Sequence, residues 1–583
     1  MVHARFDDLR AETALGFPEP DLLLRADRPD QVVGVLDEVQ RATDAGGWAY
    51  GYLAYEAAAG LDPVLDVHPA PADGMPLVWF GVGGAPRSVA PLDEGPDADP
   101  GYTAHWAPAW SPAEHERAVG EVRARIAEGE TYQCNLTVRM RGRVSGDVAR
   151  LYRDLALTQR GSHNAYLDLG RWVIASASPE LFFELRGDDV LLRPMKGTAP
   201  RGRDLAEDHA RIAELRSSSK ERAENIMIVD LMRNDVSRVA EIGSVRVPAL
   251  LSVEWFETVL QLTSDITARL RPGTGWVELF RALFPCGSVT GAPKPSTMAL
   301  IRELEPTPRG VYCGAIGWLG PPDAPVRARF NVAIRTAVVD RATGEAVYGT
   351  GGGITYSSDP SAEHAEVLHK AAILDRRHQP FELLETMLCQ PGPVLRNLDR
   401  HLSRLATSAA YVGFRFDRQH VLDTLTARLA GSGTATRVRL RLRRDGLVTV
   451  DVEQAPLPDA GPVRVAVHPE PVDPRRWWLY HKTSMREPYE RRRLARPELD
   501  DVLLVNAAGE LTEATRANLA VCLAGRWYTP PVTAGCLPGV ERARLLAAGR
   551  LLERPLTVPE LARADGLALV SSLRGWRPAT LVG

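Results

Sequence analysis

The 583-residue sequence has few cysteines and no long apolar run. Its six cysteines form no CxxC pair, and their spacing indicates neither a zinc site nor a disulfide framework. No apolar stretch approaches the roughly 18 residues of a membrane-spanning helix, and the start of the chain lacks the apolar core of a signal peptide. We therefore expect a reduced, cytoplasmic protein without a membrane partner.

An excess of one charge is also missing. The chain has 70 Lys and Arg against 74 Asp and Glu, a formal net charge of −4. This balance gives no electrostatic reason to expect a nucleic acid as partner. Hydrophobic residues make up 45% and charged residues 25% of the chain, an ordinary globular composition, and the length allows several domains.

Two stretches predict the domain organisation. Residues 84–115 are rich in Pro, Gly, Asp and Ala and indicate a loop or joint. Residues 374–380 are polar and end in proline, so we expect the main boundary there. Helical and strand periodicities occur on both sides, which predicts a mixed α/β (α+β) fold class in both halves. The predicted divisions are 1–110, 111–376 and 377–583.

A helix predicted over 220–235 places a carboxylate on an apolar face. Glu224, Met227, Ile228 and Leu231 follow one another at helical spacing. A carboxylate in such a place costs several kcal/mol to bury unless it is paired, hydrogen-bonded or bound to a metal. The pattern is therefore consistent with either a buried salt bridge or a metal site at Glu224.

A glycine run over 349–353 precedes a short acidic helix. Its open N–H groups next to a helix N-terminus suit an anion. Glu366 and Lys370, four residues apart on that helix, fit an ordinary surface ion pair equally well.

Taken together, these segments resemble the chorismate-binding family. The resemblance covers about residues 110–375, and residues 1–110 match more loosely. It implies an anthranilate synthase component I-like β-sandwich with helices. The segments that carry it, in the family's order, are 129–137, 178–180, 195–198, 220–235, 287–294, 309–314, 331–336 and 351–370.

The resemblance also implies roles for individual residues. Mg²⁺ is expected between Glu224 and Glu366, bridging to the ring carboxylate of chorismate, because hard oxygen ligands suit this ion. Glu180 is the expected general acid for the departing C4 hydroxyl. The expected substrate contacts are Gln133, Thr198, Gln261, Thr290, Gly291, Tyr312, Arg335, Gly352, Gly353 and Lys370.

Two positions indicate which reaction the family site performs. Members that add water carry lysine at the position of Gln133, and an amide cannot activate water. Members that make anthranilate usually carry alanine at the position of Lys196. Members that make aminodeoxychorismate carry lysine there, which attacks C2 and expels the C4 hydroxyl before ammonia enters at C4 and displaces it. Gln261 departs from the frequent histidine and cannot shuttle a proton. We expect 4-amino-4-deoxychorismate, with anthranilate or 2-amino-2-deoxyisochorismate as the alternatives.

The source of ammonia is missing from the chain. Glutamine amidotransferases of this pathway use a cysteine in a Gly-x-Cys-x-Gly elbow, and none of the six cysteines has that context. A separate glutaminase subunit is therefore expected as partner.

Residues 381–576 resemble the fold-type IV enzymes that use pyridoxal phosphate. The segments that carry the resemblance are 385–386, 401–405, 479–484, 511–518, 537–542 and 572–576. The resemblance implies that Lys482 binds the cofactor covalently and acts as the catalytic base, while Glu513 faces the pyridine nitrogen. The phosphate is expected on Arg404 and on the N–H groups of Val540 and Glu541, with a hydroxyl added by Thr515.

The two halves together imply consecutive steps from chorismate to 4-aminobenzoate, the second with loss of pyruvate. For the second half, a branched-chain or D-amino-acid aminotransferase and a non-catalytic docking domain remain alternatives. Fold-type IV proteins commonly carry another strand and a loop before the position of Glu385. That part must come from the synthase half or from a second subunit, or the domain is impaired. A homodimer through this domain is left open.

Overall fold

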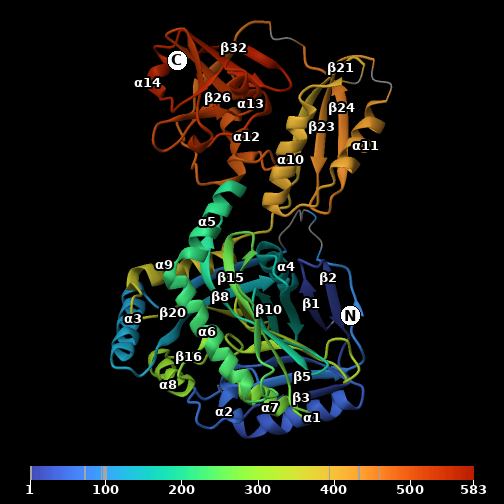
Figure 1. Ribbon diagram of the computed structural model, residues 1–583, viewed down its shortest axis with the longest axis vertical. Coiled ribbons are helices and arrows are strands. Elements are labelled where there is room, and N and C mark those ends of the chain that lie inside the picture. Colours follow the sequence, from blue (N-terminus) through green and yellow to red (C-terminus); the bar gives the residue numbers. More distant parts are fainter. Residues whose placement is uncertain are drawn as a thin grey trace. The chain divides into compact units, whose positions relative to one another are not determined.

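The computed structural model describes residues 3–70, 74–92, 95, 101–392, 394–430, 433–457 and 460–582 (Figure 1). Its contacts divide the chain into two compact units. The first unit comprises Met1–Pro200 and Ile212–Gln379, and the second comprises Arg201–Arg211 and Pro380–Gly583. The second unit thus includes a short segment from the first half of the chain. No helix of the described residues is long and apolar enough to cross a membrane.

Two antiparallel sheets of ten strands each form the framework of the first unit. The first sheet runs in the order β16 (Gly291–Ala292), β8 (Gln133–Gly146), β20 (Glu345–Ile354), β19 (Thr336–Asp340), β10 (Trp172–Ser178), β9 (His163–Asp168), β1 (Ala4–Asp8), β2 (Thr13–Phe17) and β6 (Arg87–Ser88), with β7 (Tyr102–Pro108) beside β8. The second runs in the order β13 (Met195–Pro200), β15 (Val259–Arg269), β12 (Asp189–Arg193), β11 (Leu181–Arg186), β18 (Ala328–Val332), β17 (Ala315–Leu319), β4 (Trp48–Leu53), β5 (Val78–Gly83) and β3 (Leu22–Ala26), with β14 (Arg246–Trp255) beside β15.

A buried aromatic cluster joins the two sheets. Phe17 and Ile174 from the first sheet and Tyr50, Tyr52 and Trp318 from the second belong to one core cluster. The rings of Phe17 and Tyr50 lie 4.9 Å apart. Burial of such large apolar side chains stabilises a sandwich by removing their surface from water. The predicted β-sandwich with helices is confirmed.

Helices cover the outer faces of this sandwich. On the second sheet, α6 buries Asn225, Ile228, Val229 and Met232. Of the predicted stripe, only Ile228 is buried, and Glu224, Met227 and Leu231 are half-buried, so the buried face of the helix is offset from the predicted one. The helices of the first unit are α1 (Val32–Asp44), α2 (Ala58–Leu61), α3 (Pro112–Ala127), α4 (Val148–Gln159), α6 (Ser219–Ser237), α7 (Trp276–Leu283), α8 (Lys294–Leu304) and α9 (Pro360–Ala371), with short 3₁₀ turns η1 (Pro29–Gln31), η2 (Tyr55–Ala57), η3 (Gly287–Val289) and η4 (Ala372–Asp375).

The second unit contains two further sheets. Its four-stranded sheet runs in the order β22 (Val394–Leu395), β21 (Leu383–Gln390), β23 (Thr436–Leu442) and β24 (Val448–Gln454), and α10 (Leu398–Val412) and α11 (Arg418–Leu429) share its core. Its eight-stranded sheet runs in the order β27 (Leu511–Ala514), β26 (Asp501–Val505), β25 (Val463–Val467), β32 (Gly575–Leu581), β31 (Gly566–Ser571), β28 (Asn518–Leu523), β29 (Arg526–Thr529) and β30 (Leu552–Glu553).

An extra pairing of β27 with β28 closes the larger sheet on itself. The remaining elements of this unit are α12 (Glu487–Leu494), α13 (Val540–Ala547), α14 (Val558–Leu561), η5 (Trp477–Leu479) and η6 (Val532–Ala534). Helix α5 (Leu205–Ser217) begins in the second unit and ends in the first. Both halves are therefore mixed α and β, as predicted.

Candidate active sites

Strand β13 carries Lys196 to the face of helix α6. The Lys196 Nζ lies 3.2 Å from Oε2 of Glu224. The side chain of Asn225, next along the helix, donates from Nδ2 to the Lys196 carbonyl at 3.0 Å, and Ser264 in turn donates to Asn225 at 2.7 Å. Both side chain and backbone of Lys196 are thus fixed from α6. Asn225 was missed by the sequence reasoning, although it adjoins Glu224.

The glycine run on β20 lies directly against Lys196. A Cβ added to Gly353 would stand 2.5 Å from the Lys196 Nζ and 2.6 Å from Nε2 of Gln133, so any side chain would fill the space between them. Gln133 is 1% exposed, and neither its amide nitrogen nor its amide oxygen has a hydrogen-bond partner among the described residues. A buried amide without partners is costly, which indicates a polar ligand here.

Two further carboxylates lie near the two predicted metal ligands. Glu224 is joined by Glu221, three residues earlier on α6, and Glu366 is joined by Glu363, three residues earlier on α9. A Cβ on Gly352 would lie 3.2 Å from Glu363 Oε2 and 3.8 Å from Glu366 Oε1. Burial, together with the neighbouring carboxylates, raises the pKa values of Glu221 and Glu363. Residues at i and i+3 share a helix face, so this spacing could have revealed Glu221 and Glu363 in the sequence.

The carboxylates are held by lysines. Lys370 donates to Oε1 of Glu366 at 2.7 Å and to the Gly351 carbonyl at 2.8 Å. Burial alone would raise the pKa of Glu366, but the positive charges of Lys370 and Lys196 outweigh it and hold the pKa below its usual value. The sequence left open whether Glu224 and Glu366 form ion pairs or a metal site, and both ion pairs are present.

The donor set fits Mg²⁺, because carboxylate oxygens are the ligands that this ion prefers. In the described part of the chain, however, no three or more His, Cys, Asp or Glu side chains converge into a ready-made metal centre. The ion pairs of Lys196 and Lys370 hold the two predicted ligands instead.

Glu180 is a buried acid at the edge of this site. It follows β10 and is 3% exposed, and it accepts a hydrogen bond from Ser288 Oγ at 2.7 Å. Burial raises the pKa of Glu180 to about 7, against a smaller opposing effect of Ser288. A carboxyl group with such a pKa can donate a proton near neutral pH, as a general acid must.

Arg335 lies beside Lys370. Arg335 Nη1 donates to the Lys370 carbonyl at 2.9 Å, and its backbone adopts a left-handed φ of 54°. Burial lowers the pKa of Lys370, although Glu366 opposes this effect. Two cations beside open glycines are suited to binding the carboxylates of a substrate.

Thr198 and Gln261 bind each other. Thr198 Oγ1 donates to Gln261 Oε1 at 2.8 Å, and Gln261 Nε2 donates to the Gly197 carbonyl at 2.9 Å. The Gln261 amide therefore holds strand β13, which carries Lys196. The predicted contact of these two side chains with substrate stays a prediction.

Thr290 and Gly291 lie in the protein wall around Gln133, whereas Tyr312 packs against Gly349 on β20. A Cβ on Gly291 would stand 2.0 Å from the Gln133 carbonyl oxygen, so the close approach of β16 to β8 requires glycine. Thr290 is fully buried, with its hydroxyl donating to a backbone carbonyl, and Tyr312 is 7% exposed. Their predicted substrate contacts stay predictions.

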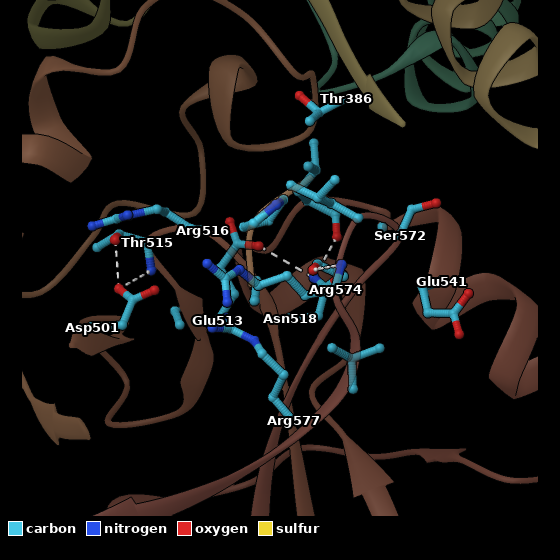
Figure 2. A pocket seen from close by; sticks show the side chains of 18 of the residues that line it. Thr386, Asp501, Glu513, Thr515, Arg516, Asn518, Glu541, Ser572, Arg574 and Arg577 are labelled. Carbon is cyan, nitrogen blue, oxygen red and sulfur yellow. Dashed lines mark hydrogen bonds between the residues drawn. The ribbon is translucent and has the colours of Figure 1, made fainter. Parts of the chain in front are cut away.

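A cavity of about 650 Å³ in the second unit contains the other lysine (Figure 2). Burial, assisted by the positive charges of Arg486 and Arg404, lowers the pKa of Lys482 to about 8. The Lys482 amine has no hydrogen-bond partner within the described residues. Burial also raises the pKa of Glu513 to about 7, and Glu513 accepts hydrogen bonds from Tyr489 and Asn518, each at 3.2 Å.

Arg404 marks another part of the cavity wall. It donates to both oxygens of Glu385 at 2.9 and 2.6 Å, and His401 lies 2.6 Å from the same carboxylate. Burial alone would raise the pKa of Glu385, but Arg404 and His401 lower it to about 2. A fixed, charged Arg404 suits a phosphate. Its predicted role in binding one stays a prediction.

Helix α13 begins at the cavity wall with Val540 and Glu541. The carboxylate of Glu541 is bound by Arg396 at 2.9 Å and by Arg544 at 2.7 Å. Because the two arginines neutralise the Glu541 carboxylate, the first N–H groups of α13 can still bind an anion.

Thr515 is turned toward Asp501. Figure 2 shows both its hydroxyl and its N–H bonded to Asp501, at 2.5 and 3.1 Å. Asp501 was missed by the sequence reasoning, since no local pattern relates it to Thr515. The hydroxyl oxygen of Thr515 still has acceptor capacity, and its contribution to a phosphate site stays a prediction.

The profile of the chorismate binding enzyme family matches residues 85–376, half of the chain. The chain belongs to the chorismate binding enzyme family. The profile of the class IV amino-transferase family matches residues 382–582, so the second unit carries a class IV aminotransferase domain. This domain implies pyridoxal phosphate. The unpartnered Lys482, the cavity and Glu513 fit that cofactor.

Relatives of this chorismate binding enzyme include two kinds of synthase. It is 41% identical over 271 residues to aminodeoxychorismate synthase component 1 of Klebsiella aerogenes, covering 46% of this chain and 58% of the relative. It is 42% identical over 315 residues to anthranilate synthase component 1 of Streptomyces coelicolor, covering 53% of this chain and 57% of the relative. The chain thus spans less than two thirds of either relative. Because the two identities are so close, they do not choose between the products.

A solved structure shows the same fold. Anthranilate synthase component I from Streptococcus pneumoniae superposes with a TM-score of 0.54 at 27% identity, covering 62% of this chain and 91% of that one. The anthranilate synthase-like architecture of the first unit is therefore shown.

Proposed function

We propose that this chain converts chorismate and ammonia to 4-amino-4-deoxychorismate in its first unit and converts that product to 4-aminobenzoate and pyruvate in its second. The observation that carries the proposal is the position of Lys196. Its amine lies at Gly353 of the glycine run, next to the Gln133 side-chain amide, which has no hydrogen-bond partner among the described residues, and it pairs with the carboxylate of Glu224. Nucleophilic catalysis requires an amine held at a substrate in this way.

In the first step, Lys196 attacks C2 of chorismate while Glu180 protonates the C4 hydroxyl as it leaves. Ammonia then enters at C4 and displaces the lysine from C2. Arg335, Lys370 and the N–H groups of Gly352 and Gly353 hold the substrate carboxylates.

Glu224 and Glu366 are the proposed holders of Mg²⁺, which when bound draws electrons toward the substrate carboxylate. Glu221 and Glu363, with their raised pKa values, stand three residues from each of them. We propose that these two acids orient the ligands or their water molecules. Metal binding would also relieve the repulsion among these carboxylates.

In the second step, Lys482 holds pyridoxal phosphate and later removes the C4 proton of aminodeoxychorismate. Bound cofactor supplies the electron sink for this chemistry. Glu513 faces the cofactor's ring nitrogen, while Arg404 and the first turn of α13 hold its phosphate. The C3–O bond then breaks and the ring becomes aromatic. The departing enolpyruvate takes up the removed proton and becomes pyruvate.

We further propose a separate glutamine amidotransferase subunit as the source of ammonia, since no cysteine of this chain has the sequence context of a glutaminase nucleophile. All six cysteines are unpaired and buried. Unpaired cysteines are usual in a reducing compartment, so we place both reactions in the cytoplasm.

Product identification tests this proposal. Purified protein is incubated with chorismate, Mg²⁺, ammonium and pyridoxal phosphate, and the products are separated by chromatography. We expect 4-aminobenzoate and pyruvate. Anthranilate as the main product would favour the second candidate, which the Streptomyces coelicolor relative supports.

A further inference from the structure

A short segment from the first half of the chain is built into the second unit. Arg201–Arg211 directly follows β13, the strand that carries Lys196, yet its contacts place it with Pro380–Gly583. Leu205 packs against the core that α10 and α11 share with the four-stranded sheet. The segment is therefore part of the unit that carries Lys482.

The start of this segment has a defined shape. Asp208 is fully buried and accepts hydrogen bonds from the Arg201 guanidinium at 2.7 and 2.9 Å and from the Gly202 N–H at 2.7 Å. A Cβ on Gly202 would lie 2.5 Å from the Cβ of Glu207, so the turn requires glycine. An ion pair this deeply buried persists only with good geometry, which makes the segment rigid.

Tyr411, on α10, binds the segment from the other side. Its hydroxyl donates to the Gly202 carbonyl at 2.7 Å. Arg201 donates to the Tyr411 carbonyl at 2.8 Å, and its guanidinium lies 4.5 Å from the centre of the Tyr411 ring. Two hydrogen bonds and a cation–π contact thus join the segment to one residue.

The same segment holds the residue before Lys482. Nε2 of His481 lies 3.1 Å from the Arg203 carbonyl, and Nδ1 lies 2.9 Å from Ser408 Oγ. The His481 ring stacks on Tyr411 at 4.4 Å and 15°. Burial lowers the pKa of His481 to about 4, so the ring is neutral. Because a carbonyl oxygen only accepts, Nε2 carries the single proton and Nδ1 accepts from Ser408.

The preceding residue is held as well. Arg203 donates from Nη1 to the Tyr480 hydroxyl at 3.0 Å, and its guanidinium lies 5.2 Å from the centre of that ring. Tyr480 and His481 are consecutive, and Lys482 follows them. The segment therefore fixes the backbone immediately before the cavity lysine.

We propose that Arg201–Arg211 is a positioning element of the Lys482 site: its Arg203 carbonyl holds His481 in one tautomer and one ring orientation, and so sets the position of Lys482. The inference rests on the proposed function, which assigns the cofactor to Lys482. It adds that a segment from the half of the chain that carries Lys196 supports the residues before Lys482.

The test uses the full-length protein and two perturbations. His481→Leu removes both hydrogen bonds of the ring, whereas His481→Gln keeps a donor for the Arg203 carbonyl. Gly202→Ala disturbs the segment without touching His481. Gly120→Ala is its matched control, because a Cβ at that helical glycine on α3 meets nothing within 4 Å. The readouts are the pyridoxal phosphate dissociation constant and the pH midpoint of the bound cofactor's visible absorbance.

We expect His481→Leu and Gly202→Ala to weaken cofactor binding about tenfold, the effect of a lost buried hydrogen bond, and to shift the pH midpoint. The dissociation constant of His481→Gln should stay within about threefold of the wild-type value. Gly120→Ala should have the wild-type value. Wild-type binding and midpoint in both perturbing variants would overturn the inference. If His481→Leu does not fold, Tyr411→Phe, which loses one hydroxyl, must still weaken binding.

The proposed function and this inference fail in different ways. A wild-type protein without any lysine-bound cofactor absorbance would overturn the assignment of Lys482, and the inference with it. A wild-type protein that binds the cofactor, with His481→Leu and Gly202→Ala variants that bind it equally well, would overturn only the positioning role.

Discussion

The two lysine sites use opposite electrostatic surroundings. Lys196 stands among acidic side chains and pairs with Glu224 at 3.2 Å. Burial, assisted by the positive charges of Arg486 and Arg404, lowers the pKa of Lys482 to about 8. Burial and neighbouring positive charges favour the neutral amine of Lys482, whereas the Lys196 amine is bound in an ion pair.

In the proposed function, one residue type, lysine, serves two chemistries. In the same proposal, Mg²⁺ bound at Glu224 would compete with the ion pair of Lys196. The site of Lys482 is prepared in advance, since burial and two guanidinium groups act without any ligand.

The largest effect is expected from Lys196→Ala. Loss of the nucleophile should lower aminodeoxychorismate formation by roughly 10³-fold or more. Lys220→Ala is the matched control, because Lys220 also lies near Glu224, at 3.9 Å, but is exposed. Chromatography of the products measures both variants. Near wild-type amination by Lys196→Ala would contradict the assigned role.

Lys482→Ala should stop the second step and spare the first. The variant is expected to release aminodeoxychorismate from chorismate and ammonium without pyruvate, because the base and cofactor anchor are gone. Mixing Lys482→Ala with Lys196→Ala should restore 4-aminobenzoate, since each supplies the step that the other lacks. A mixture that makes none, although Lys482→Ala releases the intermediate, would argue against a lyase in the second unit.

The metal ligands should show a graded response. Glu366→Gln and Glu224→Gln are expected to raise the Mg²⁺ concentration for half-maximal activity by about 100-fold, and Glu363→Gln by about tenfold. Glu116→Gln, exposed on α3, is the control. Titration of chorismate consumption with Mg²⁺ measures these constants. Equal constants for Glu366→Gln and wild type would remove Glu366 from the metal site.

The smallest effect concerns pH. Burial raises the pKa of Glu180 to about 7, so the protonated acid is lost as pH rises through 7, and amination at fixed free ammonia should fall there. Ser288→Ala removes a hydrogen bond that lowers this pKa. The falling limb of the pH profile should therefore move to higher pH in Ser288→Ala. A move to lower pH would show that Glu180 does not act as the acid.

Local pattern and the two family resemblances were sufficient to predict the mixed α/β fold, while the roles of Lys196 and Lys482 stay predictions. The glycine run over 349–353 is a short-range signal in the sequence. The structure brings Lys196, Gln133 and Gly353 together, and their contacts with a substrate stay predictions. Glu221 and Glu363 carried a readable signal as well, because each precedes a predicted ligand by three residues on the same helix.

Other features depend on contacts between distant parts of the chain. Asp501 meets Thr515 through strand pairing, and the Arg203 carbonyl meets His481 across 278 residues. No periodicity encodes such a contact, because it is set by tertiary packing. The segment Arg201–Arg211 therefore read as part of the synthase, although its contacts belong to the second unit.

The most direct test of two lysines in consecutive steps is a time course of the wild-type protein with chorismate, Mg²⁺, ammonium and pyridoxal phosphate. We expect 4-aminobenzoate and pyruvate to appear in equal amounts, and aminodeoxychorismate to be the product when pyridoxal phosphate is omitted from the cofactor-free protein. Anthranilate with an equal amount of pyruvate, formed whether or not pyridoxal phosphate is present, would contradict this expectation.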